Sequence, residues 1–139
     1  MNPQYELENI KVNVKTKLAT LWASFMFLYI YVDYFALYMP DKIEDISKSK
    51  VYVFEITQEF LLVALASVTI PALMIFLSVA LSAKVNRWTN IIIATVYIPY
   101  SLFNLAGEAW MHMVLGAVIE VFVLCLIIRY AWKWTCFTS

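Results

Sequence analysis

One apolar run decides the fold class of this chain. It covers Leu18–Met39 and reads LATLWASFMFLYIYVDYFALYM, with Asp33 as its one charged residue. A bilayer core takes about 20 helical residues at 1.5 Å each, so this run is long enough to cross it. The polar arm 1–17 precedes the run, whereas the apolar region of a cleaved signal peptide lies nearer to the start. The run is therefore predicted to be a membrane-spanning helix.

The composition of the whole chain points the same way. Of its 139 residues 63% are hydrophobic and 14% are charged, and the mean hydropathy is +0.76. Soluble domains are about 45–50% apolar and about 25% charged, and a chain this short needs polar residues to cover its large surface. A water-soluble monomer and a disordered chain are excluded. The formal net charge is zero, so no basic field indicates nucleic acid as a partner.

Three further apolar runs follow, and we expect spans at about 53–83, 88–106 and 109–134. In lipid only helices and closed barrels satisfy their backbone, and these runs lack the period-two alternation of barrel strands. The sequence therefore predicts an all-α, polytopic membrane protein. It consists of an arm at 1–17, a bundle of four transmembrane helices at 18–134 with its first span at 18–39, and a tail at 135–139.

The distribution of Lys and Arg predicts the orientation in the membrane. With four spans, the arm, the middle loop and the tail share one side, which holds seven basic residues against three on the other side. By the positive-inside rule both termini are cytoplasmic. The seven are Lys11, Lys15, Lys17, Lys84, Arg87, Arg129 and Lys133, and the three are Lys42, Lys48 and Lys50.

Three carboxyl groups lie away from the ends of the predicted spans, in Asp33, Glu59 and Glu120, whereas Glu55 is expected at the water boundary. A carboxylate at the centre of a membrane helix costs about 2.5–3.5 kcal/mol, so it normally faces the bundle or a wet cavity. Asp33 and Glu59 lie at similar depth in consecutive helices. We therefore expect them to share one site near the outer end of the bundle.

The third predicted span carries a polar stripe. One helix face carries residues that recur at alternating steps of four and three, namely Asn90, Ala94, Tyr97, Ser101, Asn104 and Glu108. In lipid this face must contact protein or a cavity, either as packing between helices or as part of a site. The candidate ligand- or ion-binding residues are Asp33, Glu59, Tyr97, Ser101, Asn104, His112 and Glu120, and no catalytic residue is assigned.

Several classes of chemistry are disfavoured by what the chain contains. It has two cysteines, Cys125 and Cys136, and one histidine, His112. These are too few for a disulfide framework, a bis-histidine haem site or a histidine-rich metal site. His112 fits a solvated position at the membrane interface. We expect no cofactor and no metal centre.

Four blocks of sequence carry a resemblance to a known family. They are Leu21–Trp22 with Tyr31–Tyr34 and Tyr38–Pro40, Glu59–Leu62 with Ile70–Pro71 and Leu77–Ser78, Asn86–Ile91, and Glu120 with Tyr130–Trp132. The chain resembles, from about Leu18 to Trp134, a family of small bacterial four-helix integral membrane proteins of unknown function. The resemblance implies four spans and the bacterial inner membrane, and it implies no activity.

Three hypotheses for the function remain open. The favoured one is a small transporter or channel-like protein whose intramembrane carboxylates bind a proton, a cation or an amine. Because four helices leave little room for a passage, it implies a homo-oligomer, a dimer or larger. The alternatives are a membrane enzyme or ligand-binding module with an Asp/Glu site, and a structural or accessory subunit. An enzyme is the less favoured class, because no nucleophile–base pair accompanies the acids.

Overall fold

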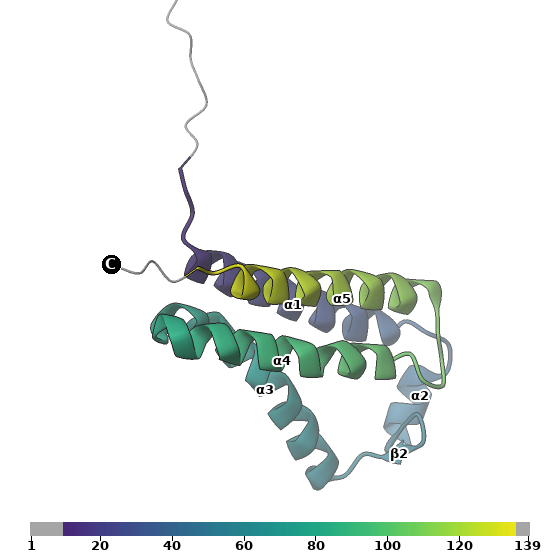
Figure 1. Cartoon of the computed structure of the whole chain (residues 1–139). Coiled ribbons are helices and arrows are strands. Elements are labelled where there is room, and N and C mark those ends of the chain that lie inside the picture. The colour runs from purple at the N-terminus through teal and green to yellow at the C-terminus, as the bar shows by residue number, and fades with distance from the viewer. Residues whose placement is uncertain (1–9, 136–139) are drawn as a thin grey trace, which may run out of the picture.

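The computed structural model describes residues 10–135, and the expectations for residues 1–9 and for 136–139, including Cys136, lie outside this range. Within it the chain is mostly helical (Figure 1). The elements are α1 (Val14–Ala36), α2 (Lys42–Ser47), β1 (Lys50–Val51), β2 (Phe54–Glu55), α3 (Gln58–Ala80), α4 (Ala83–Phe103) and α5 (Met111–Trp132).

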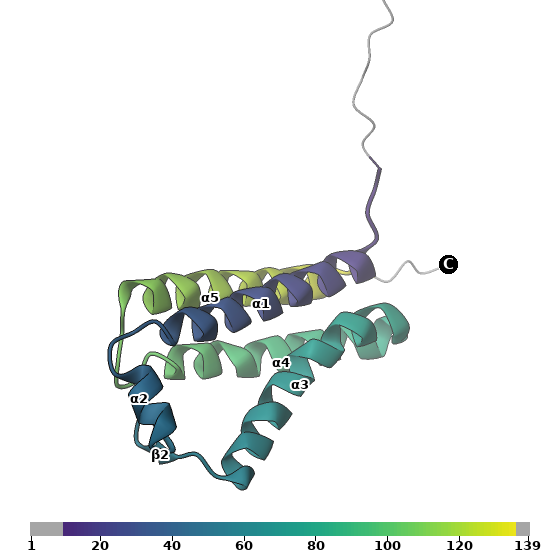
Figure 2. The ribbon, with the colours of Figure 1, turned by 180° about the vertical axis from the view of Figure 1, so that it is seen from behind.

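Three long helices lie side by side, and the fourth is inclined to them. Helix α5 packs against α1 and α4, and α1 also packs against α3. Figures 1 and 2 show that the end of α3 lies beside the other helices, whereas its beginning lies away from them. The described chain starts and ends at the same end of the bundle, and α2 with the hairpin lies at the other. We call these the chain-end and the hairpin end.

The segment between the first two predicted spans, at about 40–52, has structure of its own. It holds the short helix α2 and an antiparallel pair in which Lys50 lies opposite Glu55 and Val51 opposite Phe54. The run expected to begin near Val53 therefore becomes helical only at Gln58, where Thr57 caps α3 by accepting a hydrogen bond from the Phe60 amide at 3.1 Å.

Three of the described helices, α1, α3 and α5, are long and apolar enough to cross a membrane. Helix α4 is not among them, although its length of 21 residues is similar. Its buried face carries the polar stripe, with Asn86, Asn90, Tyr97 and Ser101, which lowers its mean hydropathy. The prediction of a helical chain is confirmed. Length and composition qualify three of the four predicted spans to cross a membrane.

The core lies nearer to the chain-end of the bundle. Leu18, Trp22 and Phe25 of α1 are buried there with Met74 of α3 and Leu124 of α5. Polar side chains within this core satisfy one another in a network around Asn90. Trp22 Nε1 donates to Asn90 Oδ1 at 2.7 Å, and Ser78 Oγ donates to the same oxygen at 3.2 Å. The network joins α1, α3 and α4.

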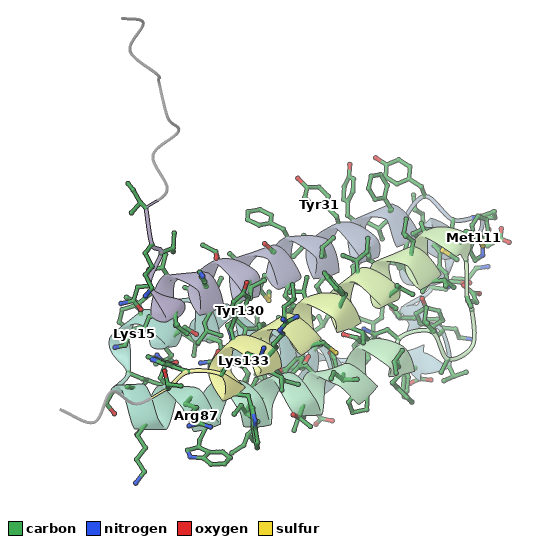
Figure 3. All side chains as sticks on the ribbon, turned by 45° about the horizontal axis from the view of Figure 1, so that its top comes forward. Lys15, Tyr31, Arg87, Met111, Tyr130 and Lys133 are labelled. Carbon is green, nitrogen blue, oxygen red and sulfur yellow. The ribbon has the colours of Figure 1, made fainter. Side chains whose placement is uncertain are left out.

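Basic side chains gather at the chain-end. Figure 3 shows Lys15, Arg87 and Lys133 toward this end and Met111 at the opposite end. Lys15 Nζ donates to the carbonyl oxygens of Val79 at 3.2 Å and Leu81 at 2.6 Å. A cation at this place is favourable because the last carbonyls of a helix carry partial negative charge. The end of α3 is thereby fixed to the start of α1.

Candidate functional site

A cavity of about 870 Å³ lies toward the hairpin end of the bundle. All four long helices contribute to its lining, and so does the hairpin segment. Three carboxyl groups line it, those of Asp33, Glu108 and Glu120, and the described residues that line it include no Lys, Arg or His. It is therefore an acidic cavity without a basic side chain on its wall.

A close contact between α1 and α5 places Asp33 and Glu120 on the wall of the same cavity. A Cβ atom added at Gly116 would overlap Cγ2 of Val32, so the two helices meet where only glycine fits. Asp33 follows Val32 in α1, and Glu120 lies one turn after Gly116 in α5. The two carboxyl groups lie near enough to interact electrostatically. Glu120 is only 3% exposed, so this contact places a carboxyl group deep in the protein.

A buried hydroxyl group accompanies Glu120. Ser101 of α4 is 1% exposed, lines the cavity and lies beside the Glu120 carboxyl. Its Oγ lacks a hydrogen-bond partner of good geometry among the described residues. The Glu120 carboxyl is its nearest polar partner, in a loose hydrogen bond. Ser101 is thus an available polar group at the acid pair.

Hydroxyl groups link the site across the bundle. Tyr29 of α1 lies one turn before Asp33, and its Oη is 3.2 Å from Oη of Tyr100. Tyr100 Oη is in turn 2.9 Å from Ser67 Oγ of α3. Asn104 also lines the cavity and lies beside Tyr29. These groups give the acidic cavity further donors and acceptors from three helices.

The rest of the wall is apolar and partly open. Val51, Val53 and Phe54 of the hairpin segment line it together with Phe60 and Val63 of α3 and Phe103 of α4. The rings of Phe54 and Phe60 are stacked at 6.0 Å. Val53, Val63 and Phe103 are 91%, 69% and 67% exposed, so the cavity opens to its surroundings along this apolar side.

An ion pair joins the two loops at the hairpin end. Lys42 Nζ of α2 lies 2.8 Å from Oε2 of Glu108, in the connection between α4 and α5. The same ammonium group lies 3.9 Å from the ring centroid of Tyr52, a cation–π contact. Glu108 therefore has a cationic partner, whereas Asp33 and Glu120 have no Lys or Arg partner among the described residues.

The expected pairing of Asp33 with Glu59 is not found. Glu59 is exposed in the first turn of α3 and does not line the cavity. Similar depth does not bring the two groups together here, because α3 diverges from α1 at this end (Figures 1 and 2). Glu120 takes the place that the sequence analysis gave to Glu59.

Two other candidates also lie outside the cavity lining. Tyr97 is buried in the core and donates its hydroxyl hydrogen to the carbonyl oxygen of Ser67. His112 is half-buried in the first turn of α5, with its ring centroid 6.4 Å from that of Trp110. Of the seven candidates, the four that line the cavity are Asp33, Ser101, Asn104 and Glu120.

Sequence reasoning missed Tyr29, Ser67 and Tyr100 as parts of the site. Tyr29 lies four residues before Asp33, and this spacing places both on one helix face. Ser67 lies one turn before Pro71, and Tyr100 lies one residue before Ser101 in the stripe. Only the spacing of Tyr29 and Asp33 was a usable signal.

The described residues hold no cluster of three or more His, Cys, Asp or Glu side chains that could bind a metal ion. What the cavity offers to a cation is two carboxyl groups, the Ser101 hydroxyl and the Asn104 side-chain amide. Opposite charge on a ligand would offset the repulsion between two neighbouring carboxylates. The arrangement suits a singly charged cation or a proton.

Comparison with known proteins was made against families, curated proteins and solved structures. A match to the family of unknown function DUF6326 covers residues 6–138. The chain belongs to this family. Neither the curated proteins nor the solved structures give a match. The resemblance to a family of unknown function is thus confirmed.

Proposed function

We propose that this chain is an integral membrane protein that binds a proton or a small cation at Asp33 and Glu120 and carries it across the bilayer. The observation that supports this most is the pair of carboxyl groups in a large cavity whose described lining has no basic side chain. In a solely structural subunit such acids would be paired or packed away. The cavity therefore favours a ligand-binding role over a structural or accessory one.

Charge balance supplies the mechanism. Two ionised carboxylates that line one cavity repel each other, and a bound cation or proton offsets this repulsion. A carboxylate binds a cation when it is ionised and releases it when it takes up a proton. The Asp33–Glu120 pair is thereby proposed to exchange a proton for a cation.

The placement in the membrane is part of the proposal. Helices α1, α3 and α5 are apolar enough to cross, and we propose that α4 crosses with its polar stripe turned to the bundle. The basic chain-end would face the cytoplasm of a bacterial cell and the hairpin end the outside (Figure 3). One copy of the bundle leaves little room for a passage, so we propose a dimer or a larger oligomer.

Isothermal titration calorimetry on the detergent-solubilised protein tests the binding site. Methylammonium, Na⁺ and K⁺ serve as probes, and we expect at least one of them to bind once per chain. Asp33→Asn and Glu120→Gln should each weaken that binding at least tenfold, because amides keep the size but remove the charge. Glu59→Gln is the matched control and should bind as the unaltered protein does.

Two results would overturn the proposal: binding of none of the three probes, or equal binding by Asp33→Asn, Glu120→Gln and the unaltered protein. Transport is tested separately with vesicles of acidic lumen. Uptake of the probe that binds should exceed uptake by vesicles carrying Glu120→Gln. Equal uptake by both would leave a binding protein without transport.

A further inference from the structure

The volume of the cavity far exceeds what a bare cation needs. A water molecule occupies about 30 Å³ in the liquid, and the cavity measures about 870 Å³. Sites for organic ligands commonly measure about 300–1,000 Å³ and combine apolar walls with a few polar groups. The size therefore fits an organic molecule.

The polarity of the cavity is divided in the same way as that of an amphiphile. The carboxyl groups of Asp33 in α1 and Glu120 in α5 line one side of the cavity, with the hydroxyl group of Ser101 in α4. The opposite side is formed by the apolar hairpin residues with Phe60 and Val63 of α3. A ligand that contacts both sides carries a cationic group at one end and an apolar body at the other.

Aromatic rings strengthen this match. Six aromatic residues line the cavity from α1, the hairpin segment, α3 and α4. Rings attract organic cations through their faces and apolar groups through dispersion, and aromatic cages recognise ammonium groups in this way. The six are Tyr29, Tyr52, Phe54, Phe60, Tyr100 and Phe103.

We infer that the ligand is a protonated organic amine with an apolar body. Its ammonium group lies between Asp33 and Glu120 and donates to Ser101, and its body lies against Phe60 and the hairpin. The open apolar side at Val53, Val63 and Phe103 is its entry path. This inference rests on the proposed function, since it names the class of cation that the acid pair binds.

A matched pair of amines tests the inference by calorimetry on the full-length protein in detergent. Benzylammonium and methylammonium carry the same charged group and differ by a phenyl ring. We expect benzylammonium to bind at least tenfold more tightly, because its ring leaves water for the apolar wall. Titration into protein-free micelles corrects for uptake by detergent.

Two variants of α3 test whether the phenyl ring of benzylammonium lies in the cavity. Phe60→Ala should weaken benzylammonium binding at least fivefold and leave methylammonium within twofold. Phe76→Ala is the control, because Phe76 is an exposed phenylalanine of the same helix that does not line the cavity. It should change neither affinity. The comparison of the two amines on the unaltered protein stands even where a variant does not fold.

The outcomes separate this inference from the proposed function. Equal affinity for the two amines, with both lost in Glu120→Gln, overturns the inference and supports the acid site. Benzylammonium binding that persists in Asp33→Asn and Glu120→Gln places the amine elsewhere and overturns the inference, whereas the proposed function is decided by the binding of methylammonium, Na⁺ and K⁺ to the same variants. An effect of Phe76→Ala equal to that of Phe60→Ala also overturns the inference.

Discussion

The hydroxyl group of Tyr97 in α4 donates a hydrogen bond to the backbone carbonyl of Ser67 in α3. In a regular helix that carbonyl would accept from the amide of residue 71, four positions later. Residue 71 is a proline that lies inside α3 and has no N–H to donate. Tyr97 thus replaces the missing donor, and the replacement joins α3 to α4 beside the cavity.

This relationship predicts the stability of two single variants and their combination. Tyr97→Phe should lower the free energy of unfolding in detergent by about 0.6–1.7 kcal/mol, the range of hydrogen bonds between membrane helices. Pro71→Ala restores an N–H to the helix. In the Pro71→Ala background the loss caused by Tyr97→Phe should therefore be smaller. Circular dichroism during denaturation measures these losses. An equal loss in both backgrounds would contradict the role of Tyr97 as the replacement donor.

Gly116 should tolerate no side chain. Because an added Cβ would overlap the stiff, β-branched Val32, α1 and α5 must separate to admit one. Gly116→Leu should destabilise the protein by about 1–3 kcal/mol, the usual cost of overpacking. It should also weaken cation binding, because separation of the two helices moves Asp33 away from Glu120. Leu115→Ala is the control, since Leu115 is exposed on the same turn. Thermal unfolding at the same temperature for both variants would show that the contact does not matter.

The long helices could be foreseen because length and hydropathy are local properties. The run Leu18–Met39 and the helix α1 agree closely, and α3 and α5 each lie on a predicted apolar run. Helix α4 begins at Ala83, five residues before its predicted run at 88–106, so Lys84 and Arg87 of the expected loop are helical. The helix α2 and the hairpin were missed, because Pro40–Lys50 reads as charged and lacks any periodic pattern. Their backbone depends on left-handed conformations at Asp41, Ser49 and Tyr52, which none of these residue types strongly signals.

The site was foreseen in part, for a related reason. The stripe of α4 fixed which residues share a face, so Ser101 and Asn104 could be found from spacing alone. Which carboxyl group meets Asp33 depends on the inclination of α3 and on the contact of Gly116 with Val32, and both are tertiary features. Spacing within one helix carries no information on the rotation of its neighbour. Depth alone therefore placed Glu59 with Asp33, whereas the structure places Glu120 on the wall of the cavity that Asp33 lines.

The Asn90 network should carry much of the stability at the chain-end. Asn90→Leu removes the acceptor of Trp22 and Ser78 and leaves two buried donors unpaired. Each such group costs about 1–3 kcal/mol, so we expect a large fall in thermal stability. Thr95→Val is the matched control on α4, because the Thr95 hydroxyl is exposed and bonds only to the carbonyl of Ile91 in its own helix. A similar fall in both variants would contradict the role of the network.

Cysteine labelling tests the orientation and the crossing of α4 together. Three single cysteines are placed at Ser47 in α2, at Ser82 before α4 and at Ala109 before α5, in a chain with Cys125→Ala and Cys136→Ala. A membrane-impermeant maleimide on intact spheroplasts should label Ser47→Cys and Ala109→Cys, because both lie at the hairpin end. Ser82→Cys should react only after permeabilisation, since it lies at the basic chain-end.

Labelling of Ser82→Cys on intact spheroplasts would show the opposite orientation. Protection of Ala109→Cys together with labelling of Ser47→Cys would place the two loops on opposite sides. That result would contradict the Lys42–Glu108 ion pair as well as the crossing of α4.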